Sequence, residues 1–130
     1  VIRAKGTSFV LVSMYLTTGL LEKGENSKKL AQISGLLSQV GLPFILQGDW
    51  NMTPSELCET QWFAKLKGAT IATPRGITWT CTAGERMLDY AVMIRELEHC
   101  VWLEPVLSTT WRPHMGLALY ISRRPRHYTM

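Results

Sequence analysis

The apolar residues at the start of the chain follow first the pattern of a strand that is apolar on both faces and then the pattern of an amphipathic helix. Residues 7–16 are β-rich and largely apolar on both faces, which predicts a central strand that is covered on both sides. Two glycines and an asparagine then break the pattern, which is typical of a loop. In residues 27–40 the apolar side chains recur at spacings of three and four, which predicts an amphipathic helix. Ser27 is its expected N-cap, and Gly41 is its expected stop.

A second strand and a second helix follow. Pro43 prevents the first helix from continuing, and residues 43–46 are apolar enough to form the next strand. A strand, a helix and a strand in this order predict a crossover unit whose two strands lie in one sheet. Residues 53–68 predict the second helix, because Thr53 can serve as its N-cap and Glu56 can complete a capping box.

The second half of the chain contains mainly short β-like segments. They span the following ranges: 77–81, 87–94, 99–106 and 116–122. No internal repeat, low-complexity segment or linker divides the sequence, so residues 1–130 are interpreted as one domain or part of one.

Composition narrows the function classes. The chain has 130 residues, of which 46% are hydrophobic and 18% charged, values typical of a globular domain that buries a core. No run approaches the roughly 18 apolar residues of a membrane span, so no membrane partner is expected. The start has neither an initiator Met nor a secretory leader pattern. We therefore expect an intracellular protein, with the nucleus as one option, whose chain begins within something larger.

The cysteine content and the net charge restrict the possible functions only weakly. Cys58, Cys81 and Cys100 are odd in number and lack a C-x-x-C spacing, which favours reduced thiols over a disulfide framework or a zinc site. The net charge of +4 favours a polyanionic partner only weakly. Three arginines cluster in residues 122–128, where they can contact phosphates or form a solvated tail.

The stretch QGDWNMT, residues 47–53, holds the first candidate site. Asp49 and Asn51 stand two positions apart where an apolar strand ends, so we expect them to project together while Trp50 turns into the packing. A carboxylate can act as a base or a metal ligand, and a carboxamide can hold an anionic oxygen. This pair suits attack on a phosphate ester. The alternative is a plain turn before the helix that begins near Thr53.

Three further residues are candidate partners. Asp89 lies within an apolar strand, where a carboxylate is costly to bury without a partner. His114 is the obvious partner, because a carboxylate on one imidazole nitrogen leaves the other for substrate. Tyr15 ends the first strand and can offer its hydroxyl. The alternatives are an ion pair between Asp89 and Arg86, and a surface role for His114.

These motifs together resemble a known family. The chain shows YL at the end of the first strand, then GDWN, LDY and PHMGLAL, in the order seen in the endonuclease/exonuclease/phosphatase superfamily. That family includes abasic-site endonucleases, pancreatic-type deoxyribonucleases, inositol-phosphate phosphatases and retrotransposon endonuclease domains. The match covers residues 8–121 and looks like the C-terminal part of the family's domain, so an N-terminally truncated domain is expected.

The resemblance implies a fold and a chemistry. The expected fold class is α/β (α+β), a partial four-layered sandwich of two mixed β-sheets flanked by helices. The implied reaction is phosphoester hydrolysis with Mg²⁺, or with Mn²⁺ as the alternative, and the implied substrate is nucleic acid. Asp49 would orient or deprotonate water and is the candidate metal ligand, while Asn51 and His114 would hold the phosphate. Asp89 would orient His114, and Tyr15 would contact the phosphate or the leaving oxygen.

Two departures from the family pattern limit this expectation. The family's metal-ligating Glu and an Asn before it belong to a half that this sequence does not contain. Arg112 and Pro113 stand before His114 where the family usually has Ser and Asp. We therefore expect the chain alone to be weakly active or inactive. The rival interpretation is a non-catalytic α/β remnant that binds protein or nucleic acid, and the sequence leaves the oligomeric state open.

Overall fold

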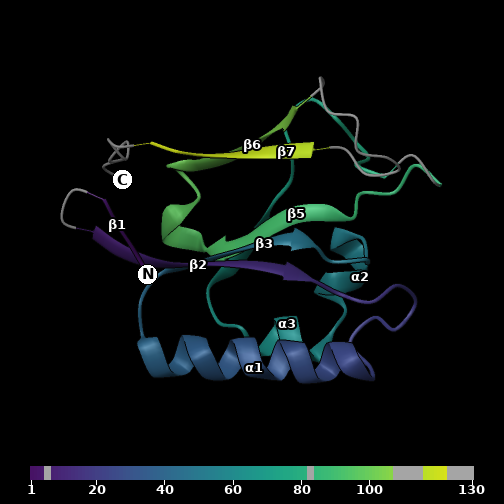
Figure 1. Ribbon diagram of the computed structural model, residues 1–130, viewed down its shortest axis with the longest axis horizontal. Coiled ribbons are helices and arrows are strands. Elements are labelled where there is room, and N and C mark those ends of the chain that lie inside the picture. Colours follow the sequence, from purple (N-terminus) through teal and green to yellow (C-terminus); the bar gives the residue numbers. More distant parts are fainter. Residues whose placement is uncertain (5–6, 82–83, 107–115, 123–130) are drawn as a thin grey trace.

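Helices, a larger sheet and a smaller sheet form three layers in the computed structural model, which describes residues 1–4, 7–81, 84–106 and 116–122 (Figure 1). The larger sheet has the order β1-β2-β3-β5-β4, and its strands are β1 Ile2–Ala4, β2 Thr7–Tyr15, β3 Phe44–Asp49, β5 Asp89–Ile94 and β4 Ala69–Ala72. The smaller sheet is an antiparallel pair of β6 Val101–Val106 and β7 Gly116–Ile121. The helices are α1 Glu25–Val40, α2 Pro54–Cys58, α3 Gln61–Lys65 and the 3₁₀-helix η1 Arg95–Leu97.

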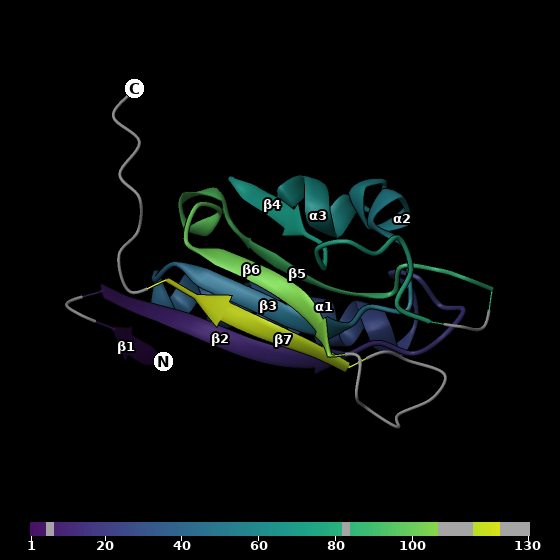
Figure 2. The same ribbon diagram turned by 90° about the horizontal axis from the view of Figure 1, so that it is seen from above.

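The predicted crossover unit is confirmed. β2 and β3 are parallel neighbours, and α1 connects them along one face of the larger sheet (Figure 1). The helices lie on that face, and β6 and β7 lie on the other (Figures 1 and 2). The expected mixed α/β fold with two sheets is therefore present. In the described part of the chain it comprises three layers, and its second sheet is antiparallel rather than mixed.

The helix boundaries confirm some local signals and correct others. α1 begins after Gly24 instead of Ser27, because the buried side chain of Asn26 holds the preceding loop. Asn26 Nδ2 donates to the carbonyl oxygens of Thr17 and Leu21 at 2.9 and 2.8 Å, and its Oδ1 accepts from the Thr17 amide at 2.7 Å. The stop at Gly41 is confirmed by its left-handed φ of 68° and its bond to Leu37.

The second predicted helix is two short helices. The capping box of Thr53 and Glu56 is confirmed at the start of α2. Thr60 then ends one helix and starts the next. Its hydroxyl donates to the Leu57 carbonyl at 2.7 Å and accepts from the Phe63 amide at 3.1 Å, so it competes with continuation of the helix.

The strands of the second half are only partly as predicted. β5, β6 and β7 lie within the expected ranges, whereas residues 77–81 do not form a strand. The amides of Thr80 and Cys81 donate to the Arg86 carbonyl, which folds this segment back as a loop. The sequence analysis missed β1 and β4, which are short edge strands paired with β2 and β5.

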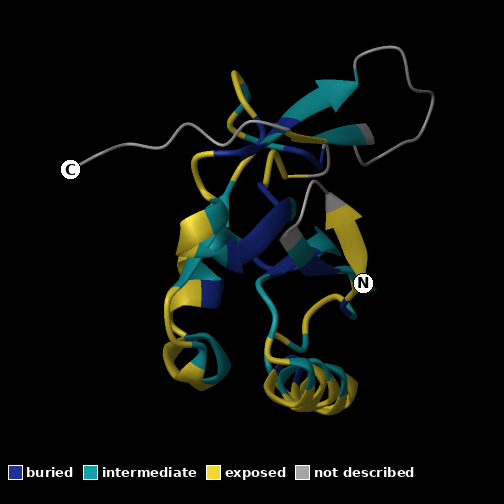
Figure 3. Cartoon of the chain, turned by 90° about the vertical axis from the view of Figure 1, so that its left-hand side faces the viewer, coloured by how far each residue is buried: buried dark blue, intermediate teal, exposed yellow. Residues whose placement is uncertain are grey.

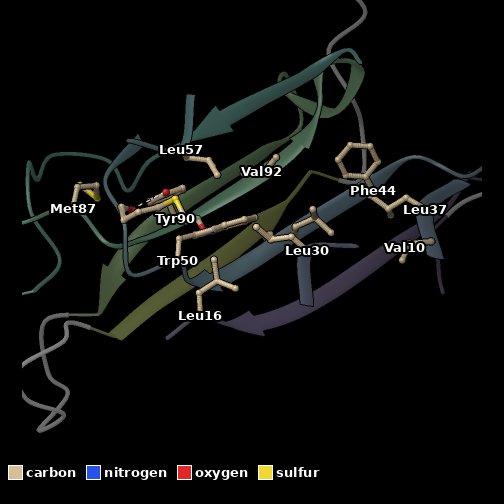
Figure 4. Close-up of a cluster of buried hydrophobic side chains, with 12 residues drawn as sticks. Val10, Leu16, Leu30, Leu37, Phe44, Trp50, Leu57, Met87, Tyr90 and Val92 are labelled. Atoms are coloured by element: carbon tan, nitrogen blue, oxygen red, sulfur yellow. Dashed lines mark hydrogen bonds between the residues drawn. The ribbon is translucent and has the colours of Figure 1, made fainter. Parts of the chain in front are cut away.

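Two apolar clusters fill the space on either side of the larger sheet. The cluster on the helix side contains the side chains of Leu30 and Leu37 from α1, packed with Trp50 and Tyr90 (Figure 4). Full burial of a leucine side chain contributes about 1.5–3 kcal/mol. Buried residues are concentrated in the strands, whereas the outer surface of α1 is exposed (Figure 3). No helix in the described residues is long and apolar enough to cross a membrane.

Candidate functional site

Three of the predicted residues form one row across the larger sheet. Tyr15, the last residue of β2, pairs with Asp49, the last residue of β3. Asp49 pairs in turn with Asp89, the first residue of β5. By strand alternation, the two acids share the face of Ile45 and Ala91, whose side chains belong to the cluster beneath the smaller sheet. The expected convergence of Asp49 and Asp89 is therefore observed.

Asp49 and Asp89 lie directly opposite each other on neighbouring antiparallel strands, in the type of pair that brings side chains closest together. The Trp50 amide donates to the Leu88 carbonyl at 2.9 Å, so the neighbouring pair of Asp49 and Asp89 is the non-hydrogen-bonded kind. In such pairs the Cα atoms lie about 4.5 Å apart, and the side chains are at their closest. The sheet thus concentrates negative charge and acceptor oxygens at one end of β3 and β5.

Gly48 allows β3 to lie close to its other neighbour, β2. Its φ is 150°, and an added Cβ would lie 2.8 Å from the carbonyl carbon of Met14 on β2, and closer still to its oxygen. Only glycine can occupy this position without moving the strands apart. The residue before Asp49 therefore fixes how near β3 approaches β2.

Asp49 also forms the turn that the alternative interpretation predicted. Its Oδ1 accepts a hydrogen bond from the Asn51 amide at 2.9 Å, which is the geometry of an Asx turn. The turn and the candidate site are therefore the same structure. One oxygen of the carboxylate is held in place by the backbone that follows it.

Asn51 reaches the site in a way that differs from the expectation. β3 ends at Asp49, and Asn51 has a left-handed φ of 48°, so strand alternation does not set the direction of its side chain. Its Nδ2 donates to the Leu16 carbonyl at 2.5 Å, and its Oδ1 accepts from the Thr18 hydroxyl at 3.1 Å. Asn51 is buried and ties the end of β3 to the loop after β2.

Trp50 packs into the helix-side cluster, as predicted. It is fully buried, its indole N–H donates to the Tyr90 carbonyl at 3.0 Å, and the two rings stack with centroids 5.6 Å apart (Figure 4). The Tyr90 hydroxyl donates to the Met52 carbonyl at 2.8 Å. Burial raises the pKa of Tyr90 far above its usual value, so this phenol stays neutral. The turn is therefore fixed from its buried side.

Asp89 is positioned by a residue that the sequence analysis did not identify. The Thr80 hydroxyl accepts hydrogen bonds from the amides of Leu88 and Asp89, both at 2.9 Å. Nothing local in the sequence predicts this contact, because it depends on how the loop folds back. The ion pair that the structure gives Arg86 is with Glu56, whereas the alternative interpretation paired Arg86 with Asp89.

Tyr15 lies at the margin of the site. Its side chain is 60% exposed, and the Lys29 ammonium lies 5.6 Å from the centre of its ring. The same ammonium donates to the Tyr15 carbonyl at 2.8 Å. Lys29 therefore brings a positive charge to the end of β2.

His114 lies outside the described residues, and its predicted pairing with Asp89 stays a prediction. Arg112, Pro113 and the arginine cluster also fall outside them. The chain leaves β6 at Val106 and re-enters the smaller sheet at Gly116, at the end where β2 and β3 finish (Figure 2).

The described residues offer few ligands for a metal ion. They contain no group of three or more His, Cys, Asp and Glu side chains that could hold a metal ion. Asp49 and Asp89 supply two carboxylates, and a cage made only of protein ligands needs more oxygens than these. The described part of the chain therefore does not by itself fit a resident metal.

Comparison with known proteins addresses the fold. No family model and no curated protein sequence matches the chain. Among solved structures, the cytolethal distending toxin of Haemophilus ducreyi matches with a TM-score of 0.62 and 14% identity, over 86% of this chain and 48% of that chain. CdtB, the biologically active subunit of cytolethal distending toxin, matches with a TM-score of 0.62 and 16% identity, over 88% and 47%. The toxin of Actinobacillus actinomycetemcomitans matches with a TM-score of 0.57 and 18% identity, over 95% and 52%.

These likenesses concern the fold, because every identity is low. The chain spans about half the length of the solved chains that it matches. Its fold is the DNase I-like fold of those neighbours, which is also that of the endonuclease/exonuclease/phosphatase superfamily. The predicted resemblance is confirmed at this level, and the narrower abasic-site or retrotransposon type stays a prediction.

Proposed function

We propose that this chain carries the general base and phosphate-holding residues of a metal-dependent phosphodiester hydrolase that acts on nucleic acid. The observation that supports this most strongly is the row of Tyr15, Asp49 and Asp89 at one end of three neighbouring strands. A carboxylate beside hydroxyl and amide donors suits hydrolysis of a phosphate ester, where water loses a proton and charge develops on oxygen.

In this proposal the residues divide the chemistry of phosphate-ester hydrolysis among them. Asp49 accepts a proton from water as the water oxygen bonds to phosphorus, and the bond to the leaving oxygen breaks. The Tyr15 hydroxyl contacts the phosphate or donates a proton to the leaving oxygen. Asn51 supports Asp49 through its backbone amide, and its side-chain nitrogen carries a second hydrogen for a phosphate oxygen. Asp89 orients His114, which steadies the phosphoryl oxygen.

Magnesium, or manganese in its place, belongs to the proposal through the family resemblance alone. Such an ion would supply charge neutralisation at the phosphate. Because the described residues do not form a metal cage, none of the steps above passes through the ion. The retroelement origin and an intracellular, nuclear setting are parts of the same proposal.

The test is a nicking assay on supercoiled plasmid with Mg²⁺ or Mn²⁺, and parallel arms use an RNA oligonucleotide and bis(p-nitrophenyl) phosphate. We expect slow turnover that falls by about a hundredfold or more in Asp49→Ala, because a general base contributes on that scale. Glu96→Gln is the matched control, since Glu96 is an exposed acid beyond the other end of β5. Turnover that survives Asp49→Ala would contradict the assigned role.

The second candidate is a non-catalytic nucleic-acid-binding module. The lack of a three-ligand metal group in the described residues favours it. Fluorescence anisotropy with labelled DNA and RNA separates the two functions. Binding without turnover in either metal, unchanged by Asp49→Asn, would support the module, whereas turnover that requires Asp49 would exclude it.

A further inference from the structure

The loop between β2 and α1 meets the turn after β3 at Asn51. Both segments lie at the end of the larger sheet that carries Asp49 (Figure 1). Asn51 is only 8% exposed, so its carboxamide needs hydrogen-bond partners for both its oxygen and its nitrogen. The loop supplies both partners. The Leu16 carbonyl accepts from Asn51 Nδ2 at 2.5 Å, and the Thr18 hydroxyl donates to Asn51 Oδ1 at 3.1 Å.

These two partners determine which way the carboxamide faces. A backbone carbonyl can only accept a hydrogen bond, so the group of Asn51 that faces Leu16 must be the nitrogen. The oxygen then faces Thr18, whose hydroxyl can donate. A carboxamide turned over would place its oxygen against the Leu16 carbonyl, where two acceptors would meet. Nδ2 keeps a second hydrogen that the Leu16 carbonyl does not use.

Residues 16 and 17 are fixed by hydrogen bonds on two sides. The Leu16 amide donates to the Asp49 carbonyl at 2.9 Å. The Thr17 amide donates to Asn26 Oδ1 at 2.7 Å, and the Thr17 carbonyl accepts from Asn26 Nδ2 at 2.9 Å. Asn26 is fully buried in the first turn of α1. All four amide and carbonyl groups of these two residues are therefore bonded, and the Thr18 side chain extends from a fixed backbone.

We propose that Thr18 is a positioning residue for Asn51, and that Asn26 holds the loop from which Thr18 acts. Thr18 orients the carboxamide so that the second hydrogen on Nδ2 is available to an acceptor oxygen. The inference rests on the proposed function, because that acceptor is there a phosphate oxygen. Thr18 acts through Asn51 and not by its own contact with substrate.

Three matched variants test the role of the Thr18 hydroxyl. Thr18→Val keeps the branched shape and removes the donor, whereas Thr18→Ser keeps the donor. Thr17→Val is the control, because the hydrogen bonds that the structure gives Thr17 involve its backbone. Thr18 is exposed, so its replacement should leave the midpoint of urea unfolding near that of the wild type.

The first readout requires no turnover. ¹⁵N-edited spectra of the full chain report how fast the side-chain NH₂ protons of Asn51 exchange with water. We expect exchange to be about three- to tenfold faster in Thr18→Val, because one hydrogen bond instead of two then holds the carboxamide. Exchange in Thr18→Ser and Thr17→Val should stay near that of the wild type. Unchanged exchange in Thr18→Val would overturn the positioning role.

The second readout is Asp49-dependent turnover of bis(p-nitrophenyl) phosphate with Mg²⁺ or Mn²⁺. We expect kcat to fall about three- to tenfold in Thr18→Val, with KM changed by about twofold at most, and Thr18→Ser to restore kcat. Either an unchanged kcat in Thr18→Val or an equal loss in Thr17→Val would overturn the proposal. Absence of any Asp49-dependent turnover would contradict the proposed function instead, and the exchange measurement would then decide alone whether Thr18 orients Asn51.

Discussion

Replacing Gly48 with alanine should separate β2 from β3 and disrupt the row of candidate residues. The added Cβ would lie 2.8 Å from the Met14 carbonyl carbon, whereas two carbon atoms at their optimum are about 3.5–4.0 Å apart. Because the obstacle is backbone, no side-chain rotation relieves it, and the strands must move apart by about 1 Å or more. The 2.9 Å bond from the Leu16 amide to the Asp49 carbonyl would then exceed hydrogen-bonding distance.

The expected cost follows from those losses. Each buried backbone group left without a partner costs about 1–3 kcal/mol, and the unusual φ of 150° adds about 1 kcal/mol or more for alanine. We expect Gly48→Ala to lower the free energy of unfolding by about 3–5 kcal/mol, a large share of the roughly 5–15 kcal/mol of a typical domain. Urea unfolding followed by tryptophan fluorescence measures this change.

Two other glycines provide matched controls. Gly41 has a φ of 68° but open space around its Cβ position, so Gly41→Ala should cost only about 1–2 kcal/mol. Gly35 lies within α1, also in open space, and Gly35→Ala should stabilise the chain by about 0.5–1 kcal/mol. A loss in Gly48→Ala no larger than that in Gly41→Ala would refute the close approach of the two strands.

Three further predictions concern single side chains. Asn51→Asp should lower the free energy of unfolding by about 2 kcal/mol in a urea titration, because an acceptor would replace the donor that faces the Leu16 carbonyl. Burial raises the pKa of Tyr90. The free energy of unfolding should therefore keep its full contribution from Tyr90 below about pH 10 and decrease above it, because the tyrosine of the unfolded chain then ionises. Tyr90→Phe should flatten that alkaline decline in thermal melts. Hydrogen bonding to the Thr53 amide lowers the pKa of Glu56. The ionised Glu56 should therefore contribute to the free energy of unfolding above about pH 4.5, and this contribution should be lost on acidification. When Glu56→Gln is titrated with acid, its free energy of unfolding should therefore decrease less than that of the wild type.

Signals that depend on neighbouring residues in the sequence predicted the structure well. The capping box at Thr53 and the stop at Gly41 need only a few adjacent residues, and both are present. The polar pair after an apolar strand predicted where Asp49 would lie. Its partner Asp89 was predicted from the cost of placing an acid in an apolar strand, and register then placed the two acids opposite each other.

Features that depend on distant contacts were missed. Thr80 positions Asp89 only because its loop folds back, and Asn26 begins α1 early because its side chain holds the preceding loop. β4 is short and becomes a strand through its pairing with β5. Gly48 did offer a local signal, since a glycine inside a strand often marks a close approach of backbone. That signal carries no information about which strand approaches.

The buried turn around Trp50 has a consequence for the proposed reaction. Asp49 and Asn51 flank a fully buried indole that is bonded to the Tyr90 carbonyl. The orientation of the carboxylate is therefore set when the chain folds, and the entropy of fixing it is lost at that stage. In the proposed hydrolysis, a phosphate ester would therefore meet a preorganised carboxylate, and little reorganisation of the protein would be required at each encounter.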